Sequence, residues 1–126
     1  MIILDTNIII ELFKGNTETK ELVENINEEN FAISVITSME LYYGAINKRE
    51  LSKIKKFLEN FYLLLINEGI SKIGLDLIEQ YSKSHGLEIP DALIAATSIY
   101  YDVPLLTYNK KDFKYIKDLK LFSSYK

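Results

Sequence analysis

The fold is decided first by residues 1–15, which run MIILDTNIIIELFKG. Residues 2–4 are continuously apolar, and two of the three are β-branched, a pattern typical of a strand buried on both faces of a parallel sheet. Asp5 ends this strand, and Thr6 or Asn7 is placed to cap a helix. A carboxylate that ends a buried strand lies at the sheet edge, where its burial is costly without a partner. Asp5 is therefore a candidate functional residue.

The same order of strand and helix recurs along the chain. Short apolar segments predict further strands at residues 31–35, 62–66 and 103–107, with a possible fifth at residues 119–122. Amphipathic or apolar segments predict further helices at residues 17–29, 37–47, 50–60, 70–85 and 90–102. This alternation predicts a three-layer α/β/α domain with a central, mainly parallel sheet of four to five strands. With no linker or repeat in sight, we expect residues 1–126 to form a single domain.

The composition limits the kinds of site that the chain can build. There is no cysteine and only one histidine, so any metal must bind oxygen ligands or His85. The hydrophobic fraction of 48% suffices for one core. The longest apolar runs are too short to span a bilayer, and the amino terminus lacks the basic segment of a signal peptide. We therefore expect a cytoplasmic protein with no membrane contact.

Charge is distributed unevenly along the chain. The net charge is −3, which argues against a generic nucleic-acid coat. Residues 1–47 carry 2 lysines and 8 acids, a charge of −6, whereas residues 110–126 carry 6 lysines and 2 aspartates, a charge of +4. A basic end on an acidic body suits a phosphate-bearing partner near one edge. The alternative is a solvated, lysine-rich end without a partner.

Four acidic residues lie at junctions between predicted strands and helices. Asp5 ends the first strand, and Glu40 lies in the first turn of the helix after the second. Asp112 lies in the turn after the fourth strand. Because the carboxyl ends of parallel strands share one edge, we expect these three side chains to lie within reach of one another. Asp91 begins a helix, but another helix precedes it without an intervening strand, so topology leaves its edge undecided.

The chemistry of such a cluster favours a hard divalent cation. Clustered carboxylates repel one another and raise their pKa values unless a cation neutralises them. With oxygen ligands only, the set suits Mg²⁺, with Mn²⁺ as a substitute. The alternative for Glu40 and Asp91 is helix capping, because an acid in the first turn stabilises a helix by about 0.3–1 kcal/mol.

Three stretches of the chain resemble the motifs of PIN-domain proteins, especially VapC-like toxins. The first is the opening stretch, residues 1–15. The second is ISVITSMELYYGA, residues 33–45, which is similar to the second motif of the family. The third is IPDALIAATSIYYDVPLLTYNKKDF, residues 89–113, which is similar to the third and fourth motifs run together. The resemblance spans nearly the whole chain, with the motifs in order and at ordinary spacing.

The resemblance implies roles for the acids. By it, Asp5, Glu40 and Asp91 are the catalytic, metal-binding residues. The last polar position of the family falls on either Asn109 or Asp112, since both residue types recur there. An asparagine would position substrate or water, and an aspartate would add a metal ligand. We place Asp112 in the catalytic and metal-binding set and keep Asn109 as a substrate-positioning alternative.

The resemblance also implies supporting groups and a reaction. Asn7 and Thr107 would be polar supports beside Asp5. By their charge, and independently of the resemblance, Lys110, Lys111 and Lys114 of the basic end are placed to steer the RNA backbone. The implied activity is Mg²⁺-dependent endoribonuclease action, which hydrolyses RNA phosphodiester bonds and leaves 5′-phosphate products. The implied biological role is the toxin component of a type II toxin–antitoxin system.

The family also implies a cognate antitoxin protein as a partner and a homodimer, to which the aromatic pair Tyr42 and Tyr43 would contribute. Two rival functions remain. An aspartate-based phosphohydrolase would want a second acid two residues after Asp5, where the chain has Asn7. A catalytically degenerate PIN-like binding module would be expected to lack some of the core acids, all of which are present.

Overall fold

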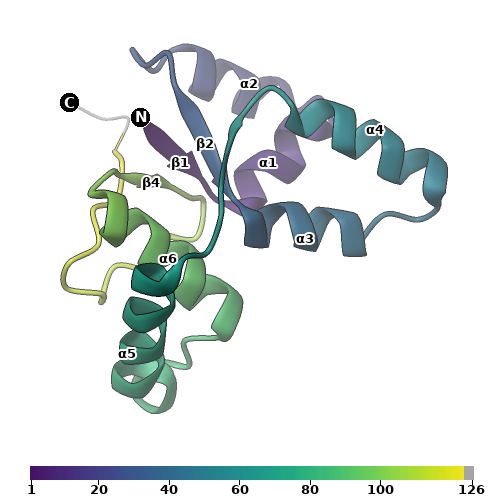
Figure 1. Ribbon diagram of the computed structural model, residues 1–126. Coiled ribbons are helices and arrows are strands. Elements are labelled where there is room, and N and C mark those ends of the chain that lie inside the picture. The colour runs from purple at the N-terminus through teal and green to yellow at the C-terminus, as the bar shows by residue number, and fades with distance from the viewer. Residues whose placement is uncertain (124–126) are drawn as a thin grey trace.

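The computed structural model describes residues 1–123, in which strands and helices alternate (Figure 1). The strands are β1 (Ile2–Leu4), β2 (Phe31–Ser34), β3 (Tyr62–Leu64) and β4 (Leu105–Leu106). The helices are α1 (Thr6–Phe13), α2 (Thr17–Glu24), α3 (Val35–Tyr43), α4 (Lys48–Leu58), α5 (Glu68–His85) and α6 (Ile89–Tyr101). A short 3₁₀ helix, η1 (Lys110–Asp112), follows β4. None of the helices in this part of the chain is long and apolar enough to cross a membrane.

The strands form one sheet with the order β3-β2-β1-β4, and every neighbouring pair is parallel. Within the described residues the sheet has four strands, as the sequence pattern predicts. The possible fifth strand at residues 119–122 is reduced to one isolated parallel bridge, between Leu105 and Leu121. Because β4 has only two residues, it offers little length for a longer ladder.

Alternate residues of β1 point to opposite faces of the sheet, and each face has its own core. Ile3 packs into a cluster with buried residues of α5 and α6, such as Ile70 and Ala95. Ile2 and Leu4 pack into a second cluster with residues of α1, α3 and α4. Figure 1 shows the two groups of helices on either side of the strands. This arrangement confirms the predicted three-layer α/β/α architecture.

Two helices begin earlier than the sequence pattern predicts. The side chain of Asp5 itself accepts the backbone N–H of Thr6 and caps α1, so the prediction of Thr6 or Asn7 as the cap was wrong. Ser34 caps α3 by accepting a backbone N–H two residues on, at 3.0 Å. Because α3 starts directly after β2, Glu40 lies in its second turn, and the prediction of a first-turn position was also wrong.

Asparagine caps account for two further differences. Asn47 and Asn67 accept backbone N–H groups three residues on, so α4 and α5 each begin two residues before the predicted start. Helix α2 ends at Glu24, earlier than predicted. Helix α6 carries Pro90 in its first turn, where a missing N–H costs nothing, and starts within one residue of the prediction.

Candidate active site

Asp5 lies at the carboxyl end of β1 with only 4% of its surface exposed. The Thr107 hydroxyl donates a 2.7 Å hydrogen bond to its Oδ2, and the Thr6 backbone N–H donates a 2.8 Å bond to its Oδ1. Burial raises the pKa of Asp5, and these two hydrogen bonds lower it. The negative charges of Glu40 and Asp112 raise it further, so the net shift is upward. Asp5 is therefore a buried carboxylate that other acids approach.

Asn7 joins the two chain segments around Asp5. Its Nδ2 donates to Asp5 Oδ2 at 3.3 Å and to Thr107 Oγ1 at 3.2 Å. Its Oδ1 accepts the backbone N–H of Tyr108 at 3.2 Å. The backbone N–H of Asn109 donates to Thr107 Oγ1 at 3.0 Å. The structure thus brings Asn7 and Thr107 beside Asp5, and Asn109 contributes through its backbone.

Glu40 projects from α3 as an exposed side chain and is held by a threonine that the sequence analysis did not assign to the site. The Thr6 hydroxyl donates a 2.7 Å hydrogen bond to Glu40 Oε1. Thr6 Oγ1 also lies 2.9 Å from the Thr37 hydroxyl. Since Thr6 has a single hydroxyl proton, Thr37 is the donor in that second bond. Thr6 directly follows Asp5 in the sequence, which was the available clue to its role.

Asp91 is half-buried in the first turn of α6. Burial raises its pKa to about 6, and the negative charges of nearby carboxylates add to the rise. In decreasing order of effect, these carboxylates belong to Asp5, Glu40, Asp112 and Glu88. Helix α6 therefore begins at the same edge as the strand ends, which answers the question that topology left open.

Asp112 is an exposed residue of η1 and shares a cavity of about 290 Å³ with Asp91. Lys111, His85 and Tyr115 also line this cavity. The imidazole of His85 stacks on the Tyr115 ring, with a centroid separation of 4.1 Å and an angle of 13° between the planes. Burial raises the pKa of the Tyr115 phenol, and the charges of Asp91 and Asp112 add to the rise. The sequence pattern places His85 at the end of the helix predicted at residues 70–85, but it gives no sign of Tyr115 beside it.

The three lysines expected to steer RNA lie on the same segment as Asp112. Lys110 and Lys111 belong to η1, Lys114 follows it, and all three are exposed. The side that carries the acids therefore also carries positive charge.

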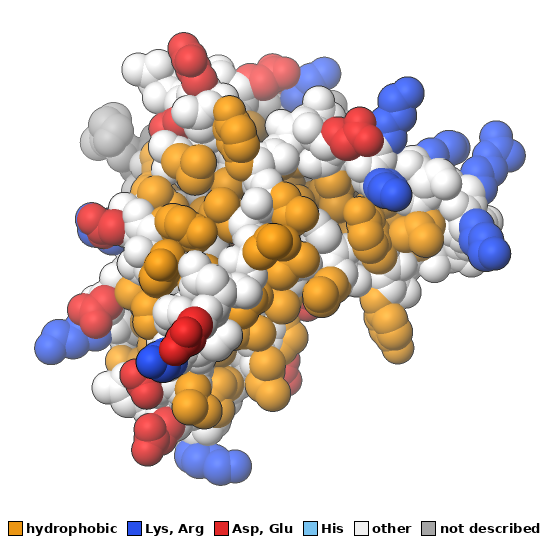
Figure 2. All heavy atoms as spheres, in the orientation of Figure 1, with side chains coloured by type: hydrophobic (Ala, Val, Ile, Leu, Met, Phe, Trp, Pro, Cys, Tyr) orange, Lys and Arg blue, Asp and Glu red, His pale blue; other side chains and the backbone are white. Residues whose placement is uncertain are grey.

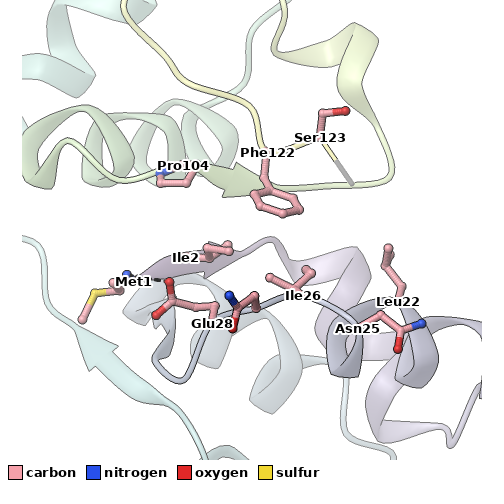
Figure 3. Close-up of a pocket in the computed structure, with 10 residues that line it drawn as sticks. Met1, Ile2, Leu22, Asn25, Ile26, Glu28, Pro104, Phe122 and Ser123 are labelled. Atoms are coloured by element: carbon pink, nitrogen blue, oxygen red, sulfur yellow. Dashed lines mark ion pairs between the residues drawn. The ribbon is translucent and has the colours of Figure 1, made fainter. Parts of the chain in front are cut away.

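A larger cavity, of about 730 Å³, lies at the opposite end of the sheet (Figure 3). Met1 and Ile2 at the start of β1 and Pro104 just before β4 contribute to its wall. Its only carboxylate, Glu28, forms a 3.1 Å ion pair with the amino group of Met1. Cavity volume therefore does not identify the candidate site, because Asp91 and Asp112 line the smaller cavity of about 290 Å³.

The acid set fits a divalent metal by its chemistry, with four carboxylates and no competing thiol. Within residues 1–123, however, no three acidic or imidazole side chains are already arranged to hold a metal ion. Like charges repel, so we expect the carboxylates to close together only around a cation.

The sequence profile of the PIN domain family matches residues 2–119 of the chain. Among individual proteins, the chain is similar to "Ribonuclease VapC19" of Mycobacterium tuberculosis, with 33% identity over 95% of this chain and 98% of the relative.

Solved structures show the same relationship. A toxin–antitoxin complex from Klebsiella pneumoniae contains a chain that is 32% identical, with a TM-score of 0.81 and coverage of 99% of this chain and 98% of that one. VapBC2 from Rickettsia felis, bound to a DNA fragment from its promoter, has 29% identity, a TM-score of 0.82 and coverage of 97% and 98%. The chain therefore belongs to the PIN domain family, with VapC ribonucleases as its relatives along nearly its whole length.

Proposed function

We propose that this chain is a single-domain, metal-dependent endoribonuclease and the toxin component of a type II toxin–antitoxin system. The observation that carries the proposal is the electrostatic coupling of Asp91 to Asp5, Glu40 and Asp112 at one edge of the sheet. The relatives named ribonuclease and toxin–antitoxin complex support the same activity and role.

Mg²⁺, with Mn²⁺ as a substitute, is the proposed cofactor. Asp5, Glu40 and Asp91 would hold it, with Asp112 as a fourth ligand. When bound, such a cation supplies a Lewis acid for phosphodiester hydrolysis and offsets the repulsion among the carboxylates.

The protein's own part in the reaction is positioning. Thr107 and Asn7 fix the Asp5 carboxylate by hydrogen bonds, and Thr6 fixes one oxygen of Glu40. These donors hold the Asp5 and Glu40 carboxylates in fixed orientations, which favours a productive arrangement of the site. Nearby lysines of η1 then attract the RNA backbone toward an otherwise acidic edge.

The proposed protein partner is a cognate antitoxin, as in the toxin–antitoxin complexes among the structural relatives. We also propose a homodimer. Tyr43 of α3 is 94% exposed and its neighbour Tyr42 is 37% exposed. Figure 2 shows hydrophobic side chains over much of one face of the molecule. Large exposed apolar areas mark interaction sites. Light scattering of the purified protein tests the dimer, and a monomer at every concentration would contradict it.

The rival phosphohydrolase finds no support in the geometry. It needs a proton-donating acid at position 7, but the Asn7 amide is occupied by Asp5 and Thr107. The RNA cleavage experiment described next distinguishes a catalytically degenerate binding module from an active enzyme.

The proposal is tested by incubating the purified protein with a panel of structured RNAs and sequencing the products. We expect internal cuts with 5′-phosphate ends in Mg²⁺ or Mn²⁺ and none in EDTA. Undiminished cleavage in EDTA would contradict the metal, and no cleavage under any condition would support the binding module.

A further inference from the structure

The cavity between α6 and η1 is lined by more residues than the proposed metal-holding acids. Its volume of about 290 Å³ equals that of about ten water molecules, which leaves room for one nucleobase. Asp91 and Asp112 belong both to its wall and to the proposed metal-holding set. An RNA strand bound with its scissile phosphate at the acids would therefore place an adjoining nucleotide at this cavity.

Aromatic rings build one part of the cavity wall. His85 and Tyr115 both line it and stack face to face at 4.1 Å. Tyr81 packs edge-on against both rings, at 5.0 Å from Tyr115 and 5.6 Å from His85. The Ser84 hydroxyl lies 2.7 Å from His85 Nδ1. Tyr81 and Ser84 thus hold the stacked pair in place. Flat aromatic side chains, histidine and tyrosine included, are the surfaces on which proteins stack unpaired RNA bases.

Charge decides which part of a nucleotide belongs here. The cavity wall carries the carboxylates of Glu88, Asp91 and Asp112 against the single lysine, Lys111. This balance disfavours a phosphate group. A nucleobase is neutral, and the exocyclic amino group of cytosine, adenine or guanine donates hydrogen bonds to carboxylates. Glu88 is exposed directly before the start of α6 and is outside the proposed metal-holding set, so its carboxylate is available to accept such a bond.

We infer that His85, Tyr115 and Glu88 form a nucleobase subsite that selects an amino-bearing base next to the bond to be cut. The inference rests on the proposed ribonuclease function and adds to it a cause of sequence preference. His85 and Tyr115 supply the stacking surface, and Glu88 accepts from the base edge. These are specificity-determining residues and not part of the acid set.

The first test compares cleavage by His85→Ala, His85→Phe and the wild-type protein on one RNA, with products sequenced. Loss of the ring should raise KM about tenfold and flatten the distribution of bases beside the cut, with little change in kcat. His85→Phe keeps a flat ring and should restore both. Tyr62→Ala serves as the matched aromatic control, because Tyr62 is exposed on β3 at the other edge of the sheet from β4.

The second test needs no catalysis. The chain has one histidine, so its ring protons give a single, assignable set of NMR signals. Glu40→Gln slows cleavage without touching the cavity, which Glu40 does not line. When this variant is saturated with a short RNA containing amino-bearing bases, we expect the His85 signals to move upfield. An oligouridine should move them less.

The inference is overturned if His85→Ala keeps the wild-type KM and cut-site distribution, or if the His85 signals stay in place in the RNA-saturated protein. Its failure is distinguishable from failure of the proposed function. If only the nucleobase subsite is wrong, the wild-type protein still cleaves RNA in a metal-dependent way. If the proposed function is wrong, the wild-type protein does not cleave RNA at all.

Discussion

The hydroxyl of Thr107 donates a 2.7 Å hydrogen bond to the buried carboxylate of Asp5, across 102 residues of chain. This bond joins the end of β1 to the segment after β4, the two neighbouring strands at the centre and edge of the sheet. It also opposes the effect of burial on the pKa of Asp5. The hydrogen bond from Thr107 therefore favours the charged form of Asp5.

Thr107→Val should destabilise the protein at neutral pH by about 1–3 kcal/mol, because a buried carboxylate loses its donor. In the wild-type protein the hydrogen bond from Thr107 lowers the pKa of Asp5, so this pKa should rise in the variant. The destabilisation should therefore shrink as the pH falls and Asp5 takes up a proton. Urea unfolding at several pH values measures this.

Thr97→Val is the matched control for that change. Thr97 is also buried, but its hydroxyl donates to the backbone carbonyl of Leu93 inside α6 and not to a carboxylate. The loss of unfolding free energy caused by Thr97→Val should not vary with pH. If the two variants show the same pH dependence, Thr107 does not act through Asp5.

Thr6→Val should weaken Mg²⁺ binding by about 10–100-fold, the usual effect of removing a group that orients a metal ligand. The variant keeps the Thr6 backbone N–H that the capping side chain of Asp5 accepts, and it loses the hydroxyl that donates to Glu40 and accepts from Thr37. Titration calorimetry of the metal measures the change. Thr17→Val, at the exposed start of α2, is the control and should bind Mg²⁺ normally. If Thr6→Val and Thr17→Val bind Mg²⁺ with equal affinity, Thr6 does not orient a metal ligand.

The stability of the metal-free protein should depend on pH through Asp91. Its pKa of about 6 is above the ordinary aspartate value, so the folded state binds this proton more tightly than the unfolded state. This contribution to stability is fully present below the unfolded pKa and is lost as the pH rises through about 6. Asp91→Asn removes the group, so its melting temperature should exceed that of the wild-type protein at about pH 8. The advantage should fall to about half at pH 5 and disappear below about pH 4, and an advantage that stays constant with pH would contradict the assigned shift.

The sequence predicted the fold well because its strongest signals are local. The apolar segment before Asp5 and the regular alternation of elements are sufficient to predict parallel strands between two layers of helices. Helix starts were less predictable. Asp5 directly follows β1 and Ser34 is the last residue of β2, and each caps a helix with no connecting loop, so the helices begin before the residues that look like ordinary caps.

Site residues were predicted from the sequence only where the residue type and its place at a strand or helix end indicated a function. The four acids mark strand and helix ends, and the structure couples them electrostatically. Thr6 escaped notice because its partner, Glu40, lies 34 residues away. The His85–Tyr115 stack escaped for the same reason, since only the packing of α5 against the segment after η1 brings the two rings together. Contacts of this kind have no period or spacing in the sequence.

Asp91→Asn, compared with Asp102→Asn, tests most directly the claim that the acids act as one metal-holding set. The two aspartates lie at opposite ends of α6, and Asp102 has a left-handed backbone that asparagine also adopts readily. Asp91→Asn should fold as well as the wild-type protein, yet lose Mg²⁺ binding and more than about a hundredfold in RNA cleavage rate. Asp102→Asn should cleave normally. An Asp91→Asn protein that melts normally and cleaves RNA at the wild-type rate would contradict the account.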